Sequence, residues 1–291
     1  MNSVDLHCHS TASDGTLPPE DVVRLAKKIG LSALALTDHD TIAGIPAAIA
    51  EALKQGIDFL PGIEISCEYP RPGTMHLLGY GIDPHNPTLT DLTRTLVEGR
   101  DARNLKIVDQ LNQLGIPVTL REIEDVAGGK VIGRPHIAEV LVRRGVVSNK
   151  QEAFNTYLGQ GGRVYADKEQ LTARRAIEMI LESGGIPVLA HPSQLKKENN
   201  AQLENVVKEL IDYGLMGVEI IHSDHNDALI DFLSGLAQRY NLLKTGGSDF
   251  HGGNKPKIQL GKAGDRQVPR EFFDRLVERK IAMAKAEKKA G

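Results

Sequence analysis

Nine side chains of the kinds that bind divalent metal ions occur in short clusters along the chain. Two pairs, His7 with His9 and Asp249 with His251, are separated by one residue. Alternate residues of an extended segment point to the same face, so both members of each pair can reach one site. The full set of candidate ligands is His7, His9, Asp14, His39, Glu64, His76, His191, Asp249 and His251.

Six imidazoles and three carboxylates are more than one ion needs. A catalytic zinc-type site uses about three protein ligands and a water, so nine candidates predict two or three divalent ions. Glu64 can bridge two of them. Mixed imidazole and carboxylate ligands favour Mn, with Fe or Zn as alternatives, over Ca or Mg. Paired metals suit phosphoester hydrolysis, because they clamp the attacking and leaving oxygens and lower the pKa of a bound water.

Short apolar runs position most of these side chains. We expect strands at Val4–His9, Ala33–Thr37, Phe59–Ser66, His76–Ile82, Ile186–Ala190, Gly217–Ile221 and Leu243–Gly246. Helical segments between most of them favour an α/β fold with a mostly parallel sheet. Nearly all the candidate ligands fall at carboxyl ends of strands, where a parallel barrel places its catalytic groups. The pattern therefore predicts a closed or nearly closed α/β barrel.

Between about residues 88 and 164 the rhythm changes, and helical segments follow one another without convincing strands. The expected helices are Leu89–Leu114, Leu120–Ala127, Pro135–Arg144 and Lys150–Leu158, with Gly-rich joints at 128–129 and 159–162. We expect residues 1–98 to form the first part of the barrel, 99–163 an all-helical insertion that acts as a lid or substrate domain, and 164–291 the second part. The insertion holds ten Lys or Arg against seven Asp or Glu, which suits a lid over an anionic substrate.

Composition sets further bounds. The chain has 291 residues, of which 41% are hydrophobic and 25% charged, as is usual for a soluble globular protein. A net charge of -3 argues against a basic surface for duplex DNA. We see no apolar run long enough for a bilayer and no signal peptide. Two cysteines imply no disulfide framework, so we expect a cytoplasmic protein, monomeric or a small homo-oligomer.

Several motifs together resemble the polymerase and histidinol phosphatase (PHP) family. They are His-Cys-His, Ser-Asp-Gly, Thr-Asp-His-Asp, Gly-Ile-Glu-Ile-Ser, Ala-His-Pro and Gly-Ser-Asp-Phe-His, and they cover residues 1–85 and 185–255. The resemblance implies a distorted seven-stranded (β/α)7 barrel with a trinuclear metal site. It also implies three ligand sets: His7, His9, Glu64 and Asp249 for one metal, Glu64, His76 and His191 for a second, and Asp14, His39 and His251 for a third.

Other motifs are similar to a bacterial branch of that family that acts on nucleotides. They are Gly133-Arg134-Pro135-His136, the segment 157–162, and Gly217-Val218-Glu219. Members of that branch remove the 3′-phosphate of nucleoside 3′,5′-bisphosphates or trim short RNAs from their 5′ ends. The resemblance implies that Arg134 and His136 bind substrate phosphate. The alternative is that Pro135 opens a helix whose neighbours are solvated. The branch often has an aromatic residue near position 222, where this chain has His222.

Three more residues are candidates for contact with substrate. His222 and His225 follow the sixth expected strand and are placed to protonate a leaving oxygen or bind phosphate. Simple surface exposure is the alternative for both. Arg163 follows the glycine-rich joint 159–162, whose backbone N–H groups can contact phosphate. A flexible linker explains that joint equally well.

We therefore predict a metal-dependent phosphoesterase that acts on a small phosphorylated nucleotide or a short RNA. A histidinol-phosphate-type phosphatase is an alternative that the barrel alone does not exclude. An amidohydrolase also opens with His-x-His on a barrel strand, but such sites commonly use a modified lysine as bridging ligand, and Glu64 fills that role best here. A non-catalytic partner-binding domain would be indicated by loss of ligands, and all nine are present.

Overall fold

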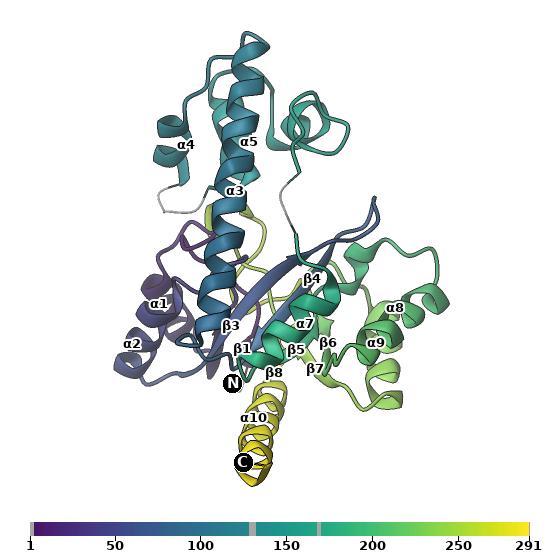
Figure 1. The fold of residues 1–291 in the computed structure, drawn as a ribbon. Coiled ribbons are helices and arrows are strands. Elements are labelled where there is room, and N and C mark those ends of the chain that lie inside the picture. The colour runs from purple at the N-terminus through teal and green to yellow at the C-terminus, as the bar shows by residue number, and fades with distance from the viewer. Residues whose placement is uncertain (1–2, 128–131, 168–169, 291) are drawn as a thin grey trace.

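The protein is seen in a computed structural model that describes residues 3–127, 132–167 and 170–290. One eight-stranded sheet organises the fold (Figure 1), in the order β7-β6-β5-β4-β3-β2-β1-β8. Its strands are β1 Ser3–Asp5, β2 Ala33–Leu36, β3 Asp58–Cys67, β4 Met75–Tyr80, β5 Ile186–Leu189, β6 Gly217–Ile221, β7 Leu243–Gly246 and β8 Val268–Pro269. The expected α/β architecture is confirmed. The sheet has eight strands instead of the expected seven, because two residues of β8 pair antiparallel with β1.

The two ends of the sheet join beyond β1 and β7. The Leu6 amide donates to the Gly246 carbonyl at 3.2 Å, and the Asp249 amide donates to the His7 carbonyl at 2.8 Å. The His9 amide continues this ladder to the Phe250 carbonyl at 2.9 Å. The barrel is therefore nearly closed at this end. The pairing also brings residues from the two ends of the chain, His7, His9 and Asp249, to one place.

Strand β4 runs opposite to both of its neighbours, in a sheet whose other pairings from β1 to β7 are parallel as expected. It pairs antiparallel with both β3 and β5. Only residues 68–74 separate β3 from β4, and a parallel connection needs a dozen or more residues. As a result His76, at the start of β4, lies beside the carboxyl ends of the parallel strands.

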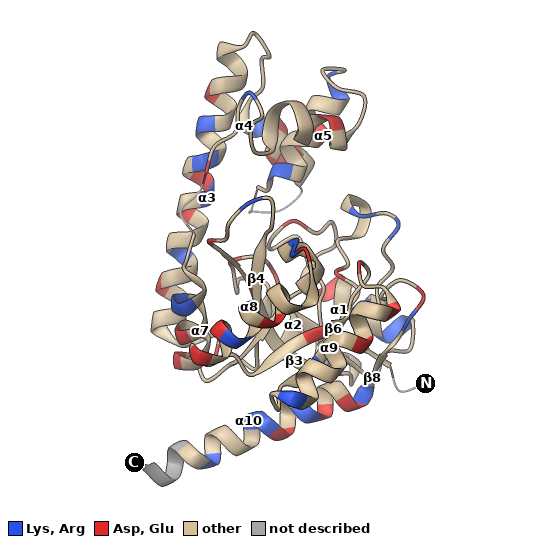
Figure 2. Ribbon diagram, turned by 90° about the vertical axis from the view of Figure 1, so that its right-hand side faces the viewer, with Lys and Arg blue, Asp and Glu red and all other residues tan. Residues whose placement is uncertain are grey.

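Helices cover the outside of the sheet and close one mouth of the barrel. They are α1 Pro19–Lys28, α2 Ile45–Gln55, α7 Ala173–Glu182, α8 Asn200–Asp212, α9 Asp227–Arg239 and α10 Arg270–Ala290. Along β2, Leu34 and Leu36 pack in the outer core under the covering helices, and the alternating Ala33 and Ala35 face the interior core. Phe273 of α10 also belongs to the interior core. Figure 2 shows α10 running along the bottom of the barrel, which leaves the opposite mouth for chemistry.

A second hydrophobic core lies above that open mouth. Its helices are α3 Pro87–Gln113, α4 Leu120–Ala127, α5 Arg134–Arg143 and α6 Lys150–Ala153, the last continued by a π-helical turn at Phe154–Leu158. Leu89 of α3 packs in the core of the barrel, whereas Ile107 and Leu111 pack in the second core. The expected boundary between residues 98 and 99 thus falls inside one continuous helix (Figure 1). The expected joint at 128–129 lies outside the described residues.

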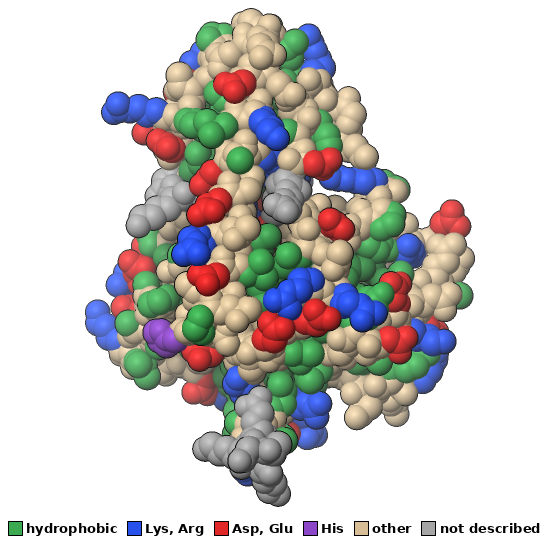
Figure 3. Space-filling model, in the orientation of Figure 1, with side chains coloured by type: hydrophobic (Ala, Val, Ile, Leu, Met, Phe, Trp, Pro, Cys, Tyr) green, Lys and Arg blue, Asp and Glu red, His purple; other side chains and the backbone are tan. Residues whose placement is uncertain are grey.

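Charged side chains of both signs are mixed over the surface. Figure 2 shows Lys or Arg alternating with Asp or Glu along α3 and α10, and Figure 3 shows the same mixture over the face that α3 and α7 cover. Histidine is nearly absent from that face, in keeping with the burial of the predicted ligands. Among the described helices, none is both long and apolar enough to cross a bilayer.

Candidate metal centre

Glu64 lies at the centre of the candidate ligands at the open mouth of the barrel. It lies near the end of β3 and is fully buried. Its Oε1 is 2.8 Å from one nitrogen of each of two imidazoles, and its Oε2 is 3.1–3.2 Å from one nitrogen of each of three more. The two are His76 and His191, and the three are His7, His9 and His39. One carboxylate thus contacts five imidazoles from four separate segments, which suits a bridging ligand.

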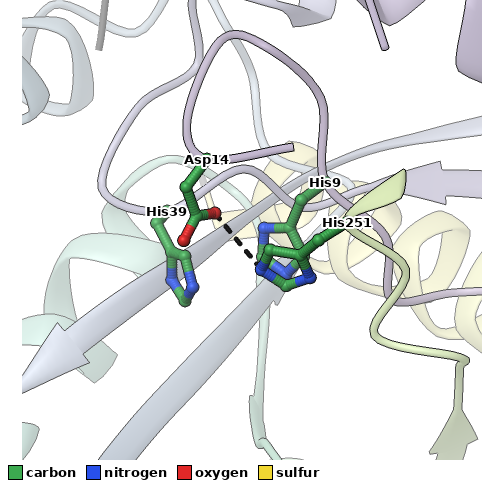
Figure 4. Close-up of side chains that lie close together, drawn as sticks. All are labelled: His9, Asp14, His39 and His251. Carbon is green, nitrogen blue, oxygen red and sulfur yellow. Dashed lines mark ion pairs between the residues drawn. The ribbon is translucent and has the colours of Figure 1, made fainter. Parts of the chain in front are cut away.

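The remaining predicted ligands complete the cluster. Asp249 Oδ1 is 3.3 Å from His9 Nε2 and 3.4 Å from His251 Nδ1. Asp14 Oδ1 is 3.2 Å from His251 Nε2, the contact drawn as a dashed line in Figure 4. The ligand atoms of His9, Asp14, His39 and His251 all lie within 4.8 Å of one another. The structure therefore brings all nine predicted ligands together.

Strand ends in this centre adopt unusual backbone conformations. Asp40, His191 and Asp249 have φ values of 57°, 26° and 59°. Residues other than glycine rarely adopt such φ values, and each residue in this conformation costs about 1–3 kcal/mol that the surrounding structure must offset. Such residues concentrate at functional sites. Here two of the three are predicted ligands.

Unpaired buried atoms test whether metal ions fit. Among the described residues, His7 Nε2, both nitrogens of His9, His39 Nδ1 and Glu64 Oε2 are buried and make no hydrogen bond of acceptable geometry. Each such atom costs about 1–3 kcal/mol if nothing satisfies it. When two ligand atoms each lie about 2.1 Å from a shared ion, with an angle of about 100° at the ion, the two atoms are about 3.2 Å apart. This separation matches the distances from Glu64 Oε2 to the imidazole nitrogens around it. The donor set therefore fits divalent ions.

The electrostatics of the centre keep its carboxylates ionised. Burial alone would raise the pKa of Glu64, but the attraction of His39 and His7 holds it well below its usual value. Burial would lower the pKa of His7, but the carboxylates Glu219 and Glu64 raise it well above its usual value. Protons and metal ions therefore compete for the same ring nitrogens.

Glu219 was not predicted as part of the centre. It is a fully buried carboxylate on β6, where Oε1 lies 3.0 Å from His7 Nδ1 and Oε2 accepts the His191 amide at 2.7 Å. A carboxylate on the far nitrogen of an imidazole fixes the ring and leaves its other nitrogen for a metal. The available signal was one acidic residue inside the apolar strand Gly-Val-Glu-Ile-Ile.

Further polar residues hold the loops that carry ligands. Buried Asp5 accepts hydrogen bonds from the His7 amide, from both the amide and the hydroxyl of Ser248, and from the Gly261 amide. Asp38 accepts from Ser10 and Ser13, in the loop that leads to Asp14. Asp40 accepts from Ser66 and from Arg100. Lys255, which the sequence did not suggest, donates to Asp249 at 2.5 Å.

The two histidines after β6 are buried, so surface exposure is the wrong alternative for both. His222 and His225 are 1% and 3% exposed. His222 Nδ1 accepts the Asp224 amide at 3.0 Å, and its Nε2 points to Asp249 Oδ2 at 3.4 Å. His225 lies behind it and donates from Nδ1 to the Ile220 carbonyl at 2.8 Å. Only His222 reaches the ligand cluster directly.

A cavity of about 390 Å³ opens next to the ligands Asp14, His39 and His76. Its other walls carry four guanidinium groups, those of Arg71, Arg100, Arg103 and Arg134. The sequence had singled out only Arg134 of these four. Three of the four come from the helical segment above the barrel, so the cavity exists only because that segment covers the mouth. A cavity with clustered cations beside a metal centre suits a phosphorylated ligand.

Arg103 is as buried as Arg100 but has no carboxylate partner among the described ion pairs. It is 5% exposed and bonds to the neutral side-chain amide of Asn104. Burial, with the added repulsion of Arg134 and Arg100, lowers the pKa of Arg103 to about 9. A bound anion would relieve both costs. Arg134 donates to the Leu158 carbonyl at 3.3 Å and remains in the cavity wall.

The two other predicted substrate residues lie elsewhere. His136 is 2% exposed, and its Nδ1 accepts the Gly133 amide at 3.0 Å, so it caps α5. Its Nε2 lies 3.3 Å from Asn254 Nδ2. Arg163 is exposed, lies over the ring of Tyr157 and is not among the residues that line the cavity. Gly159, from the glycine-rich joint, does line it.

Comparison with known proteins gives the family. The model of the PHP domain matches residues 5–223. A 5′-3′ exoribonuclease of Haemophilus influenzae is 37% identical over 85% of this chain and 89% of its own length. A 3′,5′-nucleoside bisphosphate phosphatase of Chromobacterium violaceum is 31% identical over 95% of this chain and 99% of its own.

A solved structure from Bifidobacterium adolescentis, described as a metal-dependent phosphoesterase, has the same fold. It superposes with a TM-score of 0.84 at 29% identity and covers 96% of both chains. The family model spans well over half of the chain, and the relatives match nearly its whole length. The chain therefore belongs to the PHP domain family and is a metal-dependent phosphoesterase, a hydrolase of phosphate ester bonds.

Proposed function

We propose that this protein removes the 3′-phosphate of nucleoside 3′,5′-bisphosphates and hydrolyses the corresponding bond of short 5′-phosphorylated RNA. The observation that carries the proposal is the sharing of one cavity by the ligand cluster and four arginines. A single phosphate needs only the centre, whereas a second phosphate gives the arginines a partner. The activities named for the two relatives fit the same substrates.

The nine predicted ligands would hold two or three divalent ions, with Mn the preferred metal. The proposed sets are the three given by the family resemblance, and Glu64, which contacts five imidazoles, would bridge the two sets that contain it. When bound, the ions supply a water-derived nucleophile at neutral pH and neutralise charge on the phosphate. Glu219 orients His7 and thereby the nitrogen that faces Glu64.

Arginine side chains would hold the second phosphate. Arg103 and Arg134 are the best placed, because Arg100 is already paired with Asp40 at 2.5 Å. A guanidinium binds phosphate through two parallel N–H groups, which fixes orientation as well as charge. The proposed role of residues 99–163 is that of a lid, since Arg103 and Arg134 both come from that segment.

His222 is the stronger candidate for proton donor to the leaving oxygen. Its Nδ1 accepts a backbone N–H, so the neutral ring carries its proton on Nε2, which faces the centre. The neutral ring of His225 instead donates its N–H in a hydrogen bond to the Ile220 carbonyl and has no proton left for a leaving oxygen. We also place the protein in the cytoplasm, where its two free, buried cysteines would stay reduced.

Phosphate release tests the proposal. Protein purified without added metal is assayed for metal content, then for hydrolysis of adenosine 3′,5′-bisphosphate, histidinol phosphate and an aryl phosphate with Mn, Zn, Fe or Mg. We expect the bisphosphate to be the best substrate. Arg134→Ala should raise KM for the bisphosphate about tenfold or more and leave the aryl phosphate nearly unchanged, with exposed Arg275→Ala as the control. Equal effects of Arg134→Ala on both substrates would argue against contact with a second phosphate.

A further inference from the structure

The cavity at the metal centre continues outward along one path. It shares Ser66, Arg71, Thr74, His76 and Arg134 with a small cavity of about 100 Å³. That cavity in turn shares Tyr69, Arg71 and Gln170 with an outer cavity of about 410 Å³. We call this outer cavity the outer groove. Its volume is in the range of small-ligand sites, and the arginines lie between it and the ligand cluster.

The outer groove has a different chemistry from the inner cavity. Two tyrosines and two glutamines line it, Tyr69, Tyr165, Gln160 and Gln170, together with Glu68, Arg71 and Asp167. Aromatic rings give flat apolar surfaces, and carboxamides offer paired donors and acceptors. Aromatic side chains that stack on bases, beside groups that bond to base edges, are the usual means of recognising unpaired nucleotides.

Tyr165 joins the two regions. The guanidinium carbons of Arg71 and Arg134 lie 5.3 Å and 5.7 Å from the centre of its ring. Its hydroxyl accepts a hydrogen bond from Arg71 and donates one to Asp167. The ring is therefore fixed next to the two cations that line the small cavity. A ligand whose phosphate binds those cations can bring an attached planar ring to Tyr165.

Tyr69 provides a second, independent observation. Its hydroxyl is buried and has no hydrogen-bond partner in the described part of the chain. Lys197 Nζ lies 5.0 Å from the centre of its ring. A buried hydroxyl without a partner costs about 1–3 kcal/mol, which a ligand with a polar edge would recover.

We propose that the outer groove is a nucleobase subsite in which a base of the substrate stacks on Tyr165. The inference rests on the proposed function, because it needs a substrate with phosphate at the arginines. The base belongs either to the nucleotide that loses its 3′ substituent or to the next nucleotide of an RNA. In both cases the enzyme favours a substrate that carries the base in the groove over the same substrate without that base.

Four substrates separate these cases. They are adenosine 3′,5′-bisphosphate, a base-free 1-O-methylribose 3,5-bisphosphate, a 5′-phosphorylated pentaribonucleotide, and the same oligomer without a base at its second nucleotide. Each is assayed with the metal-loaded wild type, Tyr165→Ala and Tyr165→Phe. Tyr240→Ala is the matched control, because Tyr240 also lies beside an arginine, Arg239, but directly after the end of α9 and outside the groove.

We expect Tyr165→Ala to lower kcat/KM for base-carrying substrates by roughly 5- to 150-fold, the range that base–aromatic stacking spans. The base-free bisphosphate should change less than twofold. Tyr165→Phe keeps the ring and should stay within about threefold of wild type for every substrate, and Tyr240→Ala should be neutral. A loss on adenosine bisphosphate assigns the subsite to the first base. A loss confined to the oligomer with a complete second nucleotide assigns it to the next.

Equal losses on base-carrying and base-free substrates, or no loss on any, would overturn the subsite. Calorimetric binding of adenosine 5′-monophosphate to metal-loaded protein keeps this failure separate from failure of the proposed function. If wild type hydrolyses no nucleotide but binds the monophosphate at least fivefold more tightly than Tyr165→Ala does, the proposed reaction fails and the subsite stands. If the two proteins bind it equally and Tyr165→Ala also hydrolyses adenosine bisphosphate and both oligomers as wild type does, the subsite fails and the reaction stands.

Discussion

Glu219 offers a sharp test of how the centre is held together. In Glu219→Gln the shape of the side chain is kept and the charge is lost. The carboxylate serves two donors at once, the ring of His7 at 3.0 Å and the His191 amide at 2.7 Å. A carboxamide has one acceptor oxygen, so its NH2 group must face one of these N–H groups. Glu219 is fully buried, and water cannot repair the mismatch.

The magnitude follows from these contacts. Loss of a carboxylate behind a metal-binding imidazole typically weakens metal binding or activity 10- to 100-fold, which is about 1.4–2.7 kcal/mol. The effect should be uneven across the centre. His7 and His191 belong to the two proposed sets that contain Glu64, whereas Asp14, His39 and His251 make no contact with Glu219 among the described hydrogen bonds and ion pairs. The binding of two ions should therefore weaken, and the binding of the third should not.

Metal titration measures this directly. The chelated protein is titrated with Mn against a chromophoric competitor, and hydrolysis is followed at the same free Mn concentrations. We expect the activity curve of Glu219→Gln to shift 10- to 100-fold toward higher Mn, with one equivalent still bound at wild-type affinity. The control is Glu278→Gln, because Glu278 is 63% exposed and pairs only with Arg275 on its own helix among the described contacts. A Glu219→Gln curve that overlays wild type, in a protein of equal thermal stability, would refute the positioning role.

Three further predictions concern the same mouth. His9→Ala should abolish hydrolysis with the fold kept, and full activity at unchanged metal content would show that His9 is not a ligand. The two carboxylate oxygens of Asp5 accept four hydrogen bonds, and Asp5→Asn turns one of these oxygens into an NH2 donor. This change should lower the free energy of unfolding, measured in urea, by about 1–3 kcal/mol, and an unchanged denaturation midpoint would contradict that account. Despite burial, Asp249 and Glu64 raise the pKa of His9 to about 9, so in the chelated protein the contribution of His9 to stability should be complete below the usual histidine pKa of 6.5 and be lost as pH rises through 9. Metal-loaded protein should lack this decline, and parallel melting curves for the two forms between pH 6 and 9.5 would disprove it.

Local sequence was enough to find the metal-binding chemistry. Imidazoles and carboxylates that follow short apolar runs indicate candidate ligands, because strand periodicity fixes which residues share a face and parallel strands place their carboxyl ends at one mouth. The α/β class was within reach for the same reason. The direction of β4 was also in the sequence, in the seven residues that separate it from β3, although the alternation of apolar runs alone does not reveal it.

Tertiary structure decided which residues those candidate ligands contact. Asp249 lies beside His9 because backbone pairing between the segments after β1 and β7 closes the barrel, and no local pattern encodes a contact between residues 240 positions apart. Glu219 is recognisable only once His7 is seen behind it. The arginines of the cavity lie on a helical segment whose placement over the mouth depends on its own core and on the length of α3. Sequence thus set which atoms can bind metal and phosphate, and long-range packing set their distances, because spacing along the chain fixes geometry only within one element.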